Sequence, residues 1–260
     1  MIFTQFWELP AKTAQLCCMR VSAGGFNRHR VTQCFRSSCW AATTHRTTAT
    51  RQGQMEQPKG KFIVFEGIDG SGKGTQLLRC AGFIFDLSKE NDVYITREPT
   101  RDFKQLREEM RKGQEVHQNA EWYAKTFIKD RRNHVDNYIL PALNKGTHVI
   151  CDRYKHSTLV YQHSQGMRLE DLQAMHEGIL VPDLTLIFDL DSNIAFQRRK
   201  GGGAIDVFDK DKEFLKVLRD NYRKLKDVLA EENVVYIDAA RTREEVEQDV
   251  QEQVRKVLGQ

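Results

Sequence analysis

After residue 60 the chain alternates between short apolar runs and longer amphipathic stretches. Five runs are rich in Val, Ile, Leu and Phe, and they span residues 62–66, Val93–Thr96, Thr147–Cys151, Leu184–Leu190 and Val234–Ile237. Such runs are typical of strands that are covered on both faces. The helical stretches between them supply the crossovers that parallel strands need. The pattern therefore predicts an α/β fold, with a five-stranded parallel sheet and helices on both faces.

Two helical stretches carry an apolar stripe with spacings of three and four residues. In the helix predicted over residues 212–230, the stripe consists of Leu215, Leu218, Tyr222, Leu225 and Leu229. In the last helix it consists of Val246, Val250, Val254 and Val257. The spacing favours core packing over ligand contacts for all of these side chains.

Residues 1–60 have no sustained period and are treated as an N-terminal extension of a domain that covers residues 61–260. The extension is rich in Arg, Ser and Thr and poor in acids, a composition typical of an organelle transit peptide. Two alternatives remain: a disordered tail without function, or an upstream translation that precedes a start at Met55. We therefore expect a cytoplasmic protein, or a mitochondrial one if residues 1–54 act as a transit peptide.

Charge and cysteine content narrow the function classes. Residues 1–60 hold eight Lys and Arg against two acids, whereas residues 61–260 hold 32 against 34. The near-neutral second part gives no general reason to expect nucleic-acid binding. No apolar run approaches the length of a membrane span, so we expect no membrane partner. Cys80 and Cys151 lie in apolar contexts and are expected to be buried, reduced thiols.

The segment directly after the first apolar run carries the clearest chemistry. Residues 67–73 fit G-x-x-x-x-G-K, the pattern of a phosphate-binding loop, and a helical stretch follows. Glycines allow backbone N–H groups to converge on a phosphate, and Lys73 adds a positive charge. A plain glycine-rich turn is the alternative, but the strand before and the helix after favour the phosphate loop. The predicted nucleotide-binding residues are Gly67, Ile68, Asp69, Gly70, Ser71, Gly72, Lys73, Gly74 and Thr75.

A magnesium site is expected beside this loop. The pattern normally has Ser or Thr directly after the lysine as a metal ligand, but Gly74 stands there. Either Thr75 or a water must take that role. Asp152 ends the apolar run 147–151 in the manner of a Walker B strand, so Asp152 and Thr75 are the predicted metal residues.

Charged residues also follow the other predicted strands. Arg97 comes after the second, Asp152 and Arg153 after the third, and acids after the fourth and fifth. Because ligands of open α/β sheets collect beyond the carboxyl ends of the strands, this edge suits a phosphate-rich substrate with a magnesium ion. The turn Asn144–Thr147 lacks the Asp of a guanine-specific motif, which argues against a GTPase. Phosphoryl transfer to a small acceptor fits better.

The motifs together resemble the thymidylate kinase family in order and spacing. They are Glu66–Lys73, Thr96-Arg97-Glu98-Pro99, Asp152-Arg153-Tyr154 with Ser157, Tyr161-Gln162, Pro182-Asp183-Leu184-Thr185 and Asp189-Leu190-Asp191. The resemblance covers residues 61 to about 258. It implies a three-layer P-loop fold with a short mobile lid, and phosphorylation of dTMP to dTDP by ATP with Mg²⁺. It also implies a homodimer.

The resemblance implies roles on the side of the phosphate acceptor. Asp69 is expected to accept from the sugar 3′-hydroxyl, and Arg97 and Arg153 to hold the acceptor phosphate. A cis Glu98–Pro99 bond is expected to aim Arg97 inward.

The same resemblance implies a base site. Phe127 is expected to stack on the pyrimidine, although core packing is the alternative. Arg131, one helical turn later, is expected to donate to a base carbonyl. Tyr161 and Gln162 are expected beside the sugar and base, where the tyrosine disfavours a 2′-hydroxyl.

The lid carries the remaining catalytic prediction. The family places a catalytic arginine either in the phosphate loop or in the lid, and Gly70 occupies the loop position here. The charge is therefore expected from Arg198, Arg199 or Lys200, with a solvated helix end as the alternative. Val207 stands where the family often has Arg. The predicted catalytic set is Lys73, Arg97, Asp152, Arg153, Arg198 and Arg199.

Two other functions remain open from the sequence. One is a kinase for a different nucleoside monophosphate, namely UMP/CMP or AMP. The other is a P-loop module that binds nucleotide without transferring phosphate, which the departures at Gly74 and Val207 keep in view.

Overall fold

The computed structural model describes residues 60–112, 119–200 and 212–260. The strands are β1 (Phe62–Glu66), β2 (Val93–Arg97), β3 (His148–Asp152), β4 (Leu184–Asp189) and β5 (Val234–Asp238). They form one sheet in the order β2-β3-β1-β4-β5, and all four pairings are parallel. The predicted five-stranded parallel sheet is confirmed, with strand ends that differ from the predicted ones by at most one residue. Predictions on residues 1–59 lie outside the described residues.

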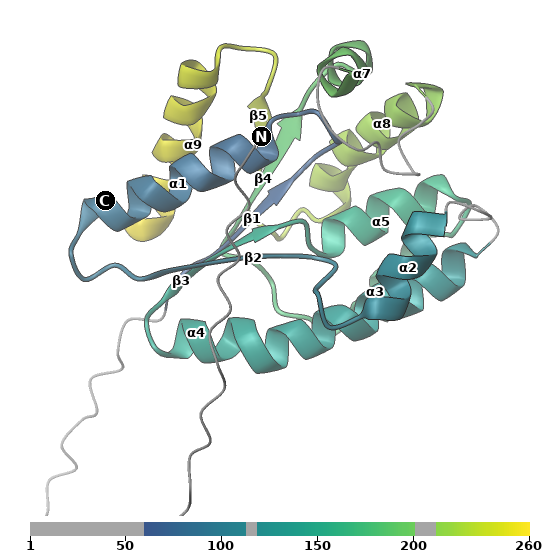
Figure 1. Ribbon diagram of the computed structural model, residues 1–260, viewed down its shortest axis with the longest axis horizontal. Helices are drawn as coiled ribbons and strands as arrows, with labels where there is room; N and C mark the ends of the chain where they lie inside the picture. The colour runs from purple at the N-terminus through teal and green to yellow at the C-terminus, as the bar shows by residue number, and fades with distance from the viewer. Residues whose placement is uncertain (1–59, 113–118, 201–211) are drawn as a thin grey trace, which may run out of the picture. The chain divides into compact units, whose positions relative to one another are not determined.

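Helices cover both faces of this sheet (Figure 1). They are α1 (Lys73–Leu87), α2 (Lys104–Lys112), α3 (Ala120–His134), η1 (Val135–Ile139), α4 (Leu140–Asn144), α5 (Lys155–Ser164), α6 (Leu169–Met175), α7 (Ser192–Lys200), α8 (Lys212–Val228) and α9 (Arg243–Leu258). Figure 1 shows α1 and α9 together on one face and α3, α4 and α5 on the other. Every residue of β1 is buried, as expected for a central strand between two helical layers.

Alternation along β1 divides the core between the layers. Ile63 and Phe65 pack in a cluster that includes Leu77 and Ile84 of α1. Phe62 and Val64 join a separate cluster with Ile139 and Leu143, from the long helical segment on the opposite face, among its members. Because successive side chains of a strand point to opposite faces, one apolar run holds both layers.

The predicted stripes pack as expected. Leu215, Leu218, Tyr222 and Leu225 of α8 are buried, as are Val246, Val250 and Val254 of α9, while Leu229 and Val257 are partly buried. Cys80 and Cys151 are buried free thiols, as predicted, and burial raises the pKa of Cys80 to about 12. Across the described ranges, no helix is both long and apolar enough to cross a membrane.

The strand order decides where the site lies. The chain moves from β1 outward to β2, returns to β3 beside β1, and then passes to β4 on the other side of β1. The turns after β1 and β3 therefore meet at the point where the strand order reverses, which is where open α/β sheets bind ligands.

Candidate active site

The phosphate loop connects β1 to the N-terminus of α1. Gly67, Gly70 and Gly72 have φ values of 135°, 87° and 92°, in a region that L side chains rarely adopt. A Cβ on Gly67 would also lie 2.7 Å from the carbonyl oxygen of Phe188 on β4. Glycine is thus required at position 67 both by its backbone angle and by its neighbour, as the sequence pattern predicts.

Lys73 begins α1 and is buried. Its Nζ donates to the carbonyl oxygens of Gly67 and Ile68, at 2.8 and 2.9 Å, and lies 3.6 Å from Oδ1 of Asp69. Burial, and then the neighbouring Arg153, lower the pKa of Lys73, while Asp69 and Asp152 act in the opposite direction. The ammonium group therefore lies over the loop, among the positive charge of Arg153 and the negative charges of Asp69 and Asp152.

Thr75 and Asp152, the two predicted metal residues, line one cavity of about 270 Å³. The cavity is bounded by Asp69, Gly70, Gly72, Lys73, Gly74, Thr75, Asp152 and Arg153. Oδ2 of Asp152 accepts from Arg97 at 3.1 Å. Oδ1 is buried and has no hydrogen-bond partner among the residues that the structure describes. A buried carboxylate oxygen without a partner fits a cation or a water.

This donor set suits a magnesium ion held mainly by phosphate oxygens and water. In the three described ranges, no group of three or more His, Cys, Asp or Glu forms a ready metal cluster. Mg²⁺ commonly keeps several waters and takes only one or two carboxylates besides substrate phosphates. Asp152, with Thr75 across the same cavity, meets that need. A Cβ on Gly74 would meet nothing within 4 Å, so space does not require glycine there.

Arg97 and Arg153 stand at the ends of different strands, and of the two only Arg153 lines this cavity. Arg97 ends β2; its side chain is 73% exposed and pairs with Asp152. The Glu98–Pro99 bond that follows is cis, as expected. Arg153 follows β3, and its guanidinium forms an ion pair with Asp69 of the phosphate loop. The predicted acceptor-side residues Asp69 and Arg153 are thus in direct contact.

Arg153 has an unusual backbone and several side-chain partners. Its φ is 71°, and it is the one non-glycine residue with positive φ in the described part of the chain. Its guanidinium donates to Ser157 Oγ at 3.0 Å and to the hydroxyl oxygens of Tyr161 and Tyr222 at 3.3 and 3.5 Å. It also lies 5.3 Å from the centre of the Tyr161 ring, a cation–π distance.

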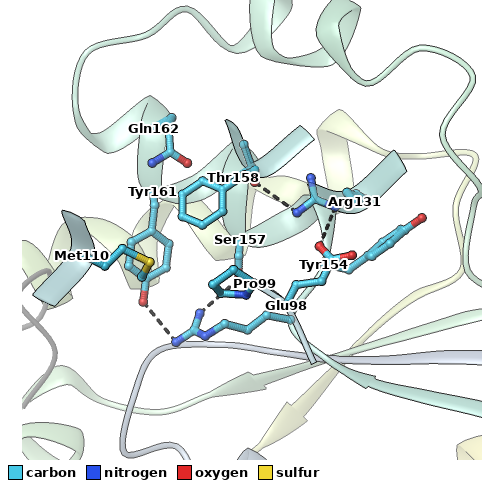
Figure 2. Close-up of a pocket in the computed structure, with 11 residues that line it drawn as sticks. Glu98, Pro99, Met110, Arg131, Tyr154, Ser157, Thr158, Tyr161 and Gln162 are labelled. Carbon is cyan, nitrogen blue, oxygen red and sulfur yellow. Dashed lines mark hydrogen bonds and ion pairs between the residues drawn. The ribbon is translucent and has the colours of Figure 1, made fainter. Parts of the chain in front are cut away.

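A second cavity of about 60 Å³ lies beside Arg153 (Figure 2). Its lining brings together five of the seven predicted acceptor residues, namely Phe127, Arg131, Arg153, Tyr161 and Gln162. The other two, Asp69 and Arg97, do not line it. The other lining residues are Glu98, Pro99, Met110, Tyr154, Ser157 and Thr158. Phe127 is partly buried against the core, so it packs and faces the cavity at once. Oε1 of Gln162 is buried without a hydrogen-bond partner in the described ranges.

Arg131 is fixed by a network of buried partners. Its side chain is 2% exposed; Nε donates to Glu98 at 2.7 Å, and Nη2 donates to Thr158 at 3.2 Å. Nη1 lies 2.8 Å from Nε2 of His176. Burial and the Arg131 charge lower the pKa of His176 to about 3, so this ring is neutral and accepts from Arg131. Glu98 also contacts Nδ1 of His134 at 3.1 Å.

Sequence patterns did not reveal these supporting residues. Glu98 stands inside a quoted motif, but His134 and His176 carry no local signal and reach Arg131 only through folding. The apolar stripe predicts that Tyr222 packs in the core. It is buried, and its hydroxyl also donates to Glu66 at 2.9 Å, which places it in the site. The apolar stripe alone did not reveal this second role.

The lid is only partly described. Arg198 on α7 donates to the carbonyl oxygen of Ala239, directly after β5, at 3.2 Å. The side chains of Arg199 and Lys200 lie outside the described residues, as does Val207. The catalytic role predicted for this segment therefore stays a prediction.

Comparisons with known proteins agree with this geometry. A family model described as thymidylate kinase matches residues 65–250. A "Probable thymidylate kinase" of Pyrococcus abyssi (strain GE5 / Orsay) is 40% identical over 199 residues, which cover 74% of this chain and 94% of that protein. A "Thymidylate kinase" of Bradyrhizobium sp. (strain ORS 278) is 39% identical over 211 residues, with 77% and 92% covered.

A "Probable thymidylate kinase" of Staphylothermus marinus (strain ATCC 43588 / DSM 3639 / JCM 9404 / F1) is 34% identical over 204 residues, covering 78% of this chain and 99% of that protein. The family match spans the phosphate loop, the Arg153 turn and the pocket around Arg131. With this site on a five-stranded parallel sheet, the chain belongs to the thymidylate kinase family.

Proposed function

We propose that this chain transfers the γ-phosphoryl group of ATP to dTMP, giving dTDP and ADP. One observation carries the proposal. Arg153 lines both the cavity of the phosphate loop and the pocket that holds Phe127 and Arg131. A monophosphate whose base fills the pocket would place its phosphate at Arg153, on the edge of the cavity that takes the phosphates of ATP.

The pocket's hydrogen-bonding groups favour a thymine or uracil base. A guanidinium has only donors, and Arg131 directs them from a fixed position. It suits a base carbonyl and opposes the exocyclic amino group of adenine or cytosine. Gln162 adds a buried acceptor for a ring N–H. These groups argue against AMP and CMP as the preferred acceptors.

The sugar contacts favour a deoxynucleotide over UMP. Tyr161 lies over the Arg153 guanidinium at the pocket wall, where its bulk disfavours a 2′-hydroxyl. Asp69 is proposed to accept from the 3′-hydroxyl while it stays near Arg153 and Lys73.

Catalysis is proposed to rest on position and charge, without a covalent intermediate. Lys73 contacts the β- and γ-phosphates, while Arg97 and Arg153 hold the acceptor phosphate and offset the repulsion between two approaching anions. Arg198 and Arg199 supply the lid charge. Asp152 and Thr75 would hold Mg²⁺, which would supply positive charge to the transferred group when bound.

The proposal extends to the domain bounds, the oligomeric state and the location of the protein in the cell. Residues 61–260 form the kinase domain, and the enzyme is a homodimer in the cytoplasm. A mitochondrial location follows instead if residues 1–54 are a transit peptide. Mass spectrometry of the N-terminus of the protein isolated from its cells distinguishes processing from a start at Met55, and light scattering of the pure protein measures the dimer.

The test of the reaction uses the purified full chain with ATP, Mg²⁺ and each of dTMP, UMP, CMP and AMP. We expect the highest kcat/KM for dTMP, by more than tenfold over UMP. Turnover of UMP or AMP without dTMP would contradict the proposed acceptor. ATP binding without turnover on any of the four would favour a nucleotide-binding module.

A further inference from the structure

Glu66 is a fully buried carboxylate to which the phosphoryl transfer proposed above gives no part. It ends β1, directly before the phosphate loop, and is 0% exposed. Four uncharged groups donate to it. They are the N–H of Tyr154 at 2.7 Å, the N–H of Ser157 at 3.1 Å, the hydroxyl of Ser157 at 2.7 Å and the hydroxyl of Tyr222 at 2.9 Å. The Tyr154 N–H belongs to the residue after Arg153, and both hydroxyls contact the Arg153 guanidinium.

The backbone of Arg153 is held to the end of β1 on both sides. Its own N–H donates to the carbonyl oxygen of Phe65 at 2.9 Å, and the next N–H, that of Tyr154, donates to Glu66. A non-glycine residue at φ 71° persists only where its surroundings over-determine it. Phe65 and Glu66 hold this turn together with Cys151, whose Sγ donates to the carbonyl oxygen of Arg153 at 3.0 Å. In this conformation the Arg153 side chain forms its ion pair with Asp69.

The hydroxyl hydrogen bonds act on the Arg153 guanidinium. The hydroxyls of Ser157 and Tyr222 both donate to the same oxygen, Oε2 of Glu66, and lie 3.1 Å from each other. A hydroxyl has one proton. Each hydroxyl donates its one hydrogen bond to Glu66, so each oxygen can only accept from other groups. Both oxygens accept from Nη1 of Arg153. Figure 2 shows Ser157 and Tyr161 on the helix that follows this turn.

We propose that Glu66 is a positioning residue that aims Arg153 at the acceptor phosphate, through the Tyr154 N–H and the two hydroxyls. The carboxylate sets the backbone of Arg153 and orients its acceptors at the same time. It touches neither nucleotide, so removing it is expected to affect acceptor binding far more than ATP binding.

The test measures dTMP and ATP binding by calorimetry on the full chain, together with kcat and both KM values. Glu66→Gln keeps the size and shape of the side chain. Its NH₂ group replaces one carboxylate oxygen, however, and then faces groups that can only be satisfied by an acceptor. We expect Glu66→Gln to weaken dTMP binding by about tenfold to a hundredfold, as for the loss of a hydrogen bond to a charged group. ATP binding is expected to change by less than about threefold, which is below the effect of one such bond.

Tyr222→Phe and Ser157→Ala test the route and serve if Glu66→Gln does not fold. Each is expected to weaken dTMP binding by about threefold to tenfold, as for one neutral hydrogen bond. Adding Tyr222→Phe to Glu66→Gln is expected to cost little more, since the hydroxyl acts through the carboxylate. Tyr236→Phe is the matched control. That hydroxyl donates to the carbonyl oxygen of Tyr222, away from Arg153, and its loss is expected to leave dTMP binding unchanged.

Equal losses of dTMP and ATP binding, full additivity, or a fall in Tm with unchanged dTMP binding would each overturn the positioning role. Failure of the proposed function gives a different result. The unmodified chain would then bind another monophosphate in place of dTMP, and the same variants are compared with that acceptor, whose phosphate meets the same Arg153.

Discussion

Arg131 of the acceptor pocket and Lys73 of the phosphate-loop cavity differ in the kind of partners that hold them. In the pocket, all three nitrogens of Arg131 have buried partners, namely Glu98, His176 and Thr158. In the cavity, Lys73 donates to carbonyl oxygens of its own loop, and Oδ1 of Asp152 has no hydrogen-bond partner in the described ranges.

The acceptor half of the site, around Arg131, and the donor half, around the phosphate loop, therefore reach their working geometry by different routes. The Arg131 guanidinium stays in place through neighbours that are present before any ligand arrives, which is preorganisation. In the donor half, the Lys73 ammonium is hydrogen-bonded to carbonyl oxygens of its own loop, and Oδ1 of Asp152 is unpaired within the described ranges. Phosphates, water and a metal ion are the partners expected for these two groups. Substitutions in the two halves should therefore have separable effects.

The largest effect is expected at Lys73. Replacing it with Ala removes a charge from the transferring phosphoryl group, and kcat should fall by about 10²–10³-fold, as for a lost electrostatic contact in a transition state. Binding of dTMP should change little, since Lys73 does not line the pocket. Steady-state kinetics with dTMP calorimetry measures both. An equal loss of dTMP binding would break the separation of the halves.

Arg131→Ala should have the opposite profile. It leaves Glu98 buried without its cationic partner, so we expect a destabilisation of about 3–5 kcal/mol in urea unfolding. In the folded fraction, dTMP binding should weaken by about a hundredfold with little change in ATP binding, because a charged hydrogen bond is worth about 1.5–3 kcal/mol.

Arg132→Ala is the matched control for this substitution. Arg132 is the next residue of α3 and is exposed, and its guanidinium donates to the carbonyl oxygens of Met175 and Glu177. It should leave dTMP binding unchanged. Equal losses of ATP and dTMP binding in Arg131→Ala would refute the base-site role.

The His176 ring should make stability depend on pH. Its pKa is about 3 in the folded chain against 6.5 for an ordinary histidine, because of burial and the Arg131 charge. Between these values the unfolded chain binds the extra proton and the folded chain does not. Stability is therefore full above pH 6.5 and falls as the pH drops, by up to about 1.4 kcal/mol per pH unit. Urea unfolding at pH 7 and pH 5 measures this slope, and His176→Asn should flatten it.

The smallest effect is expected at Gly74 of the donor half. A serine side chain meets open space there, so Gly74→Ser should fold and gain about 0.5 kcal/mol from helix propensity. If a water or Thr75 fills the missing ligand role, the Mg²⁺ concentration for half-maximal rate should fall by less than about tenfold, or about 1.4 kcal/mol. Magnesium titration of the rate measures it. A larger gain would mean that Gly74 leaves the metal site incomplete.

Much of the fold and the phosphate loop could be predicted from local pattern, whereas the base-site residues, such as Phe127 and Arg131, were implied only by the resemblance to the thymidylate kinase family. The five apolar runs became the five strands because an apolar run of that length, between turns, has few other ways to be buried. The glycines of the phosphate loop followed from angles that only glycine adopts readily, as the φ of Gly67 illustrates. Glu66, inside a quoted motif, and Tyr222, in a packing stripe, have no predicted role in the site because their partners come from other elements.

The parallel sheet, the phosphate loop and the residue types beyond the strand ends follow from the sequence alone, since these depend on periodicity and on short segments. Which side chains share a hydrogen-bond partner depends on the folded arrangement of the whole domain. The Arg131–Glu98–His176 cluster and the donors to Glu66 join residues 33 to 156 positions apart. Such contacts depend on how the helices pack on the sheet. Because a buried polar group without a partner is energetically unfavourable, only the arrangement that pairs these groups is stable.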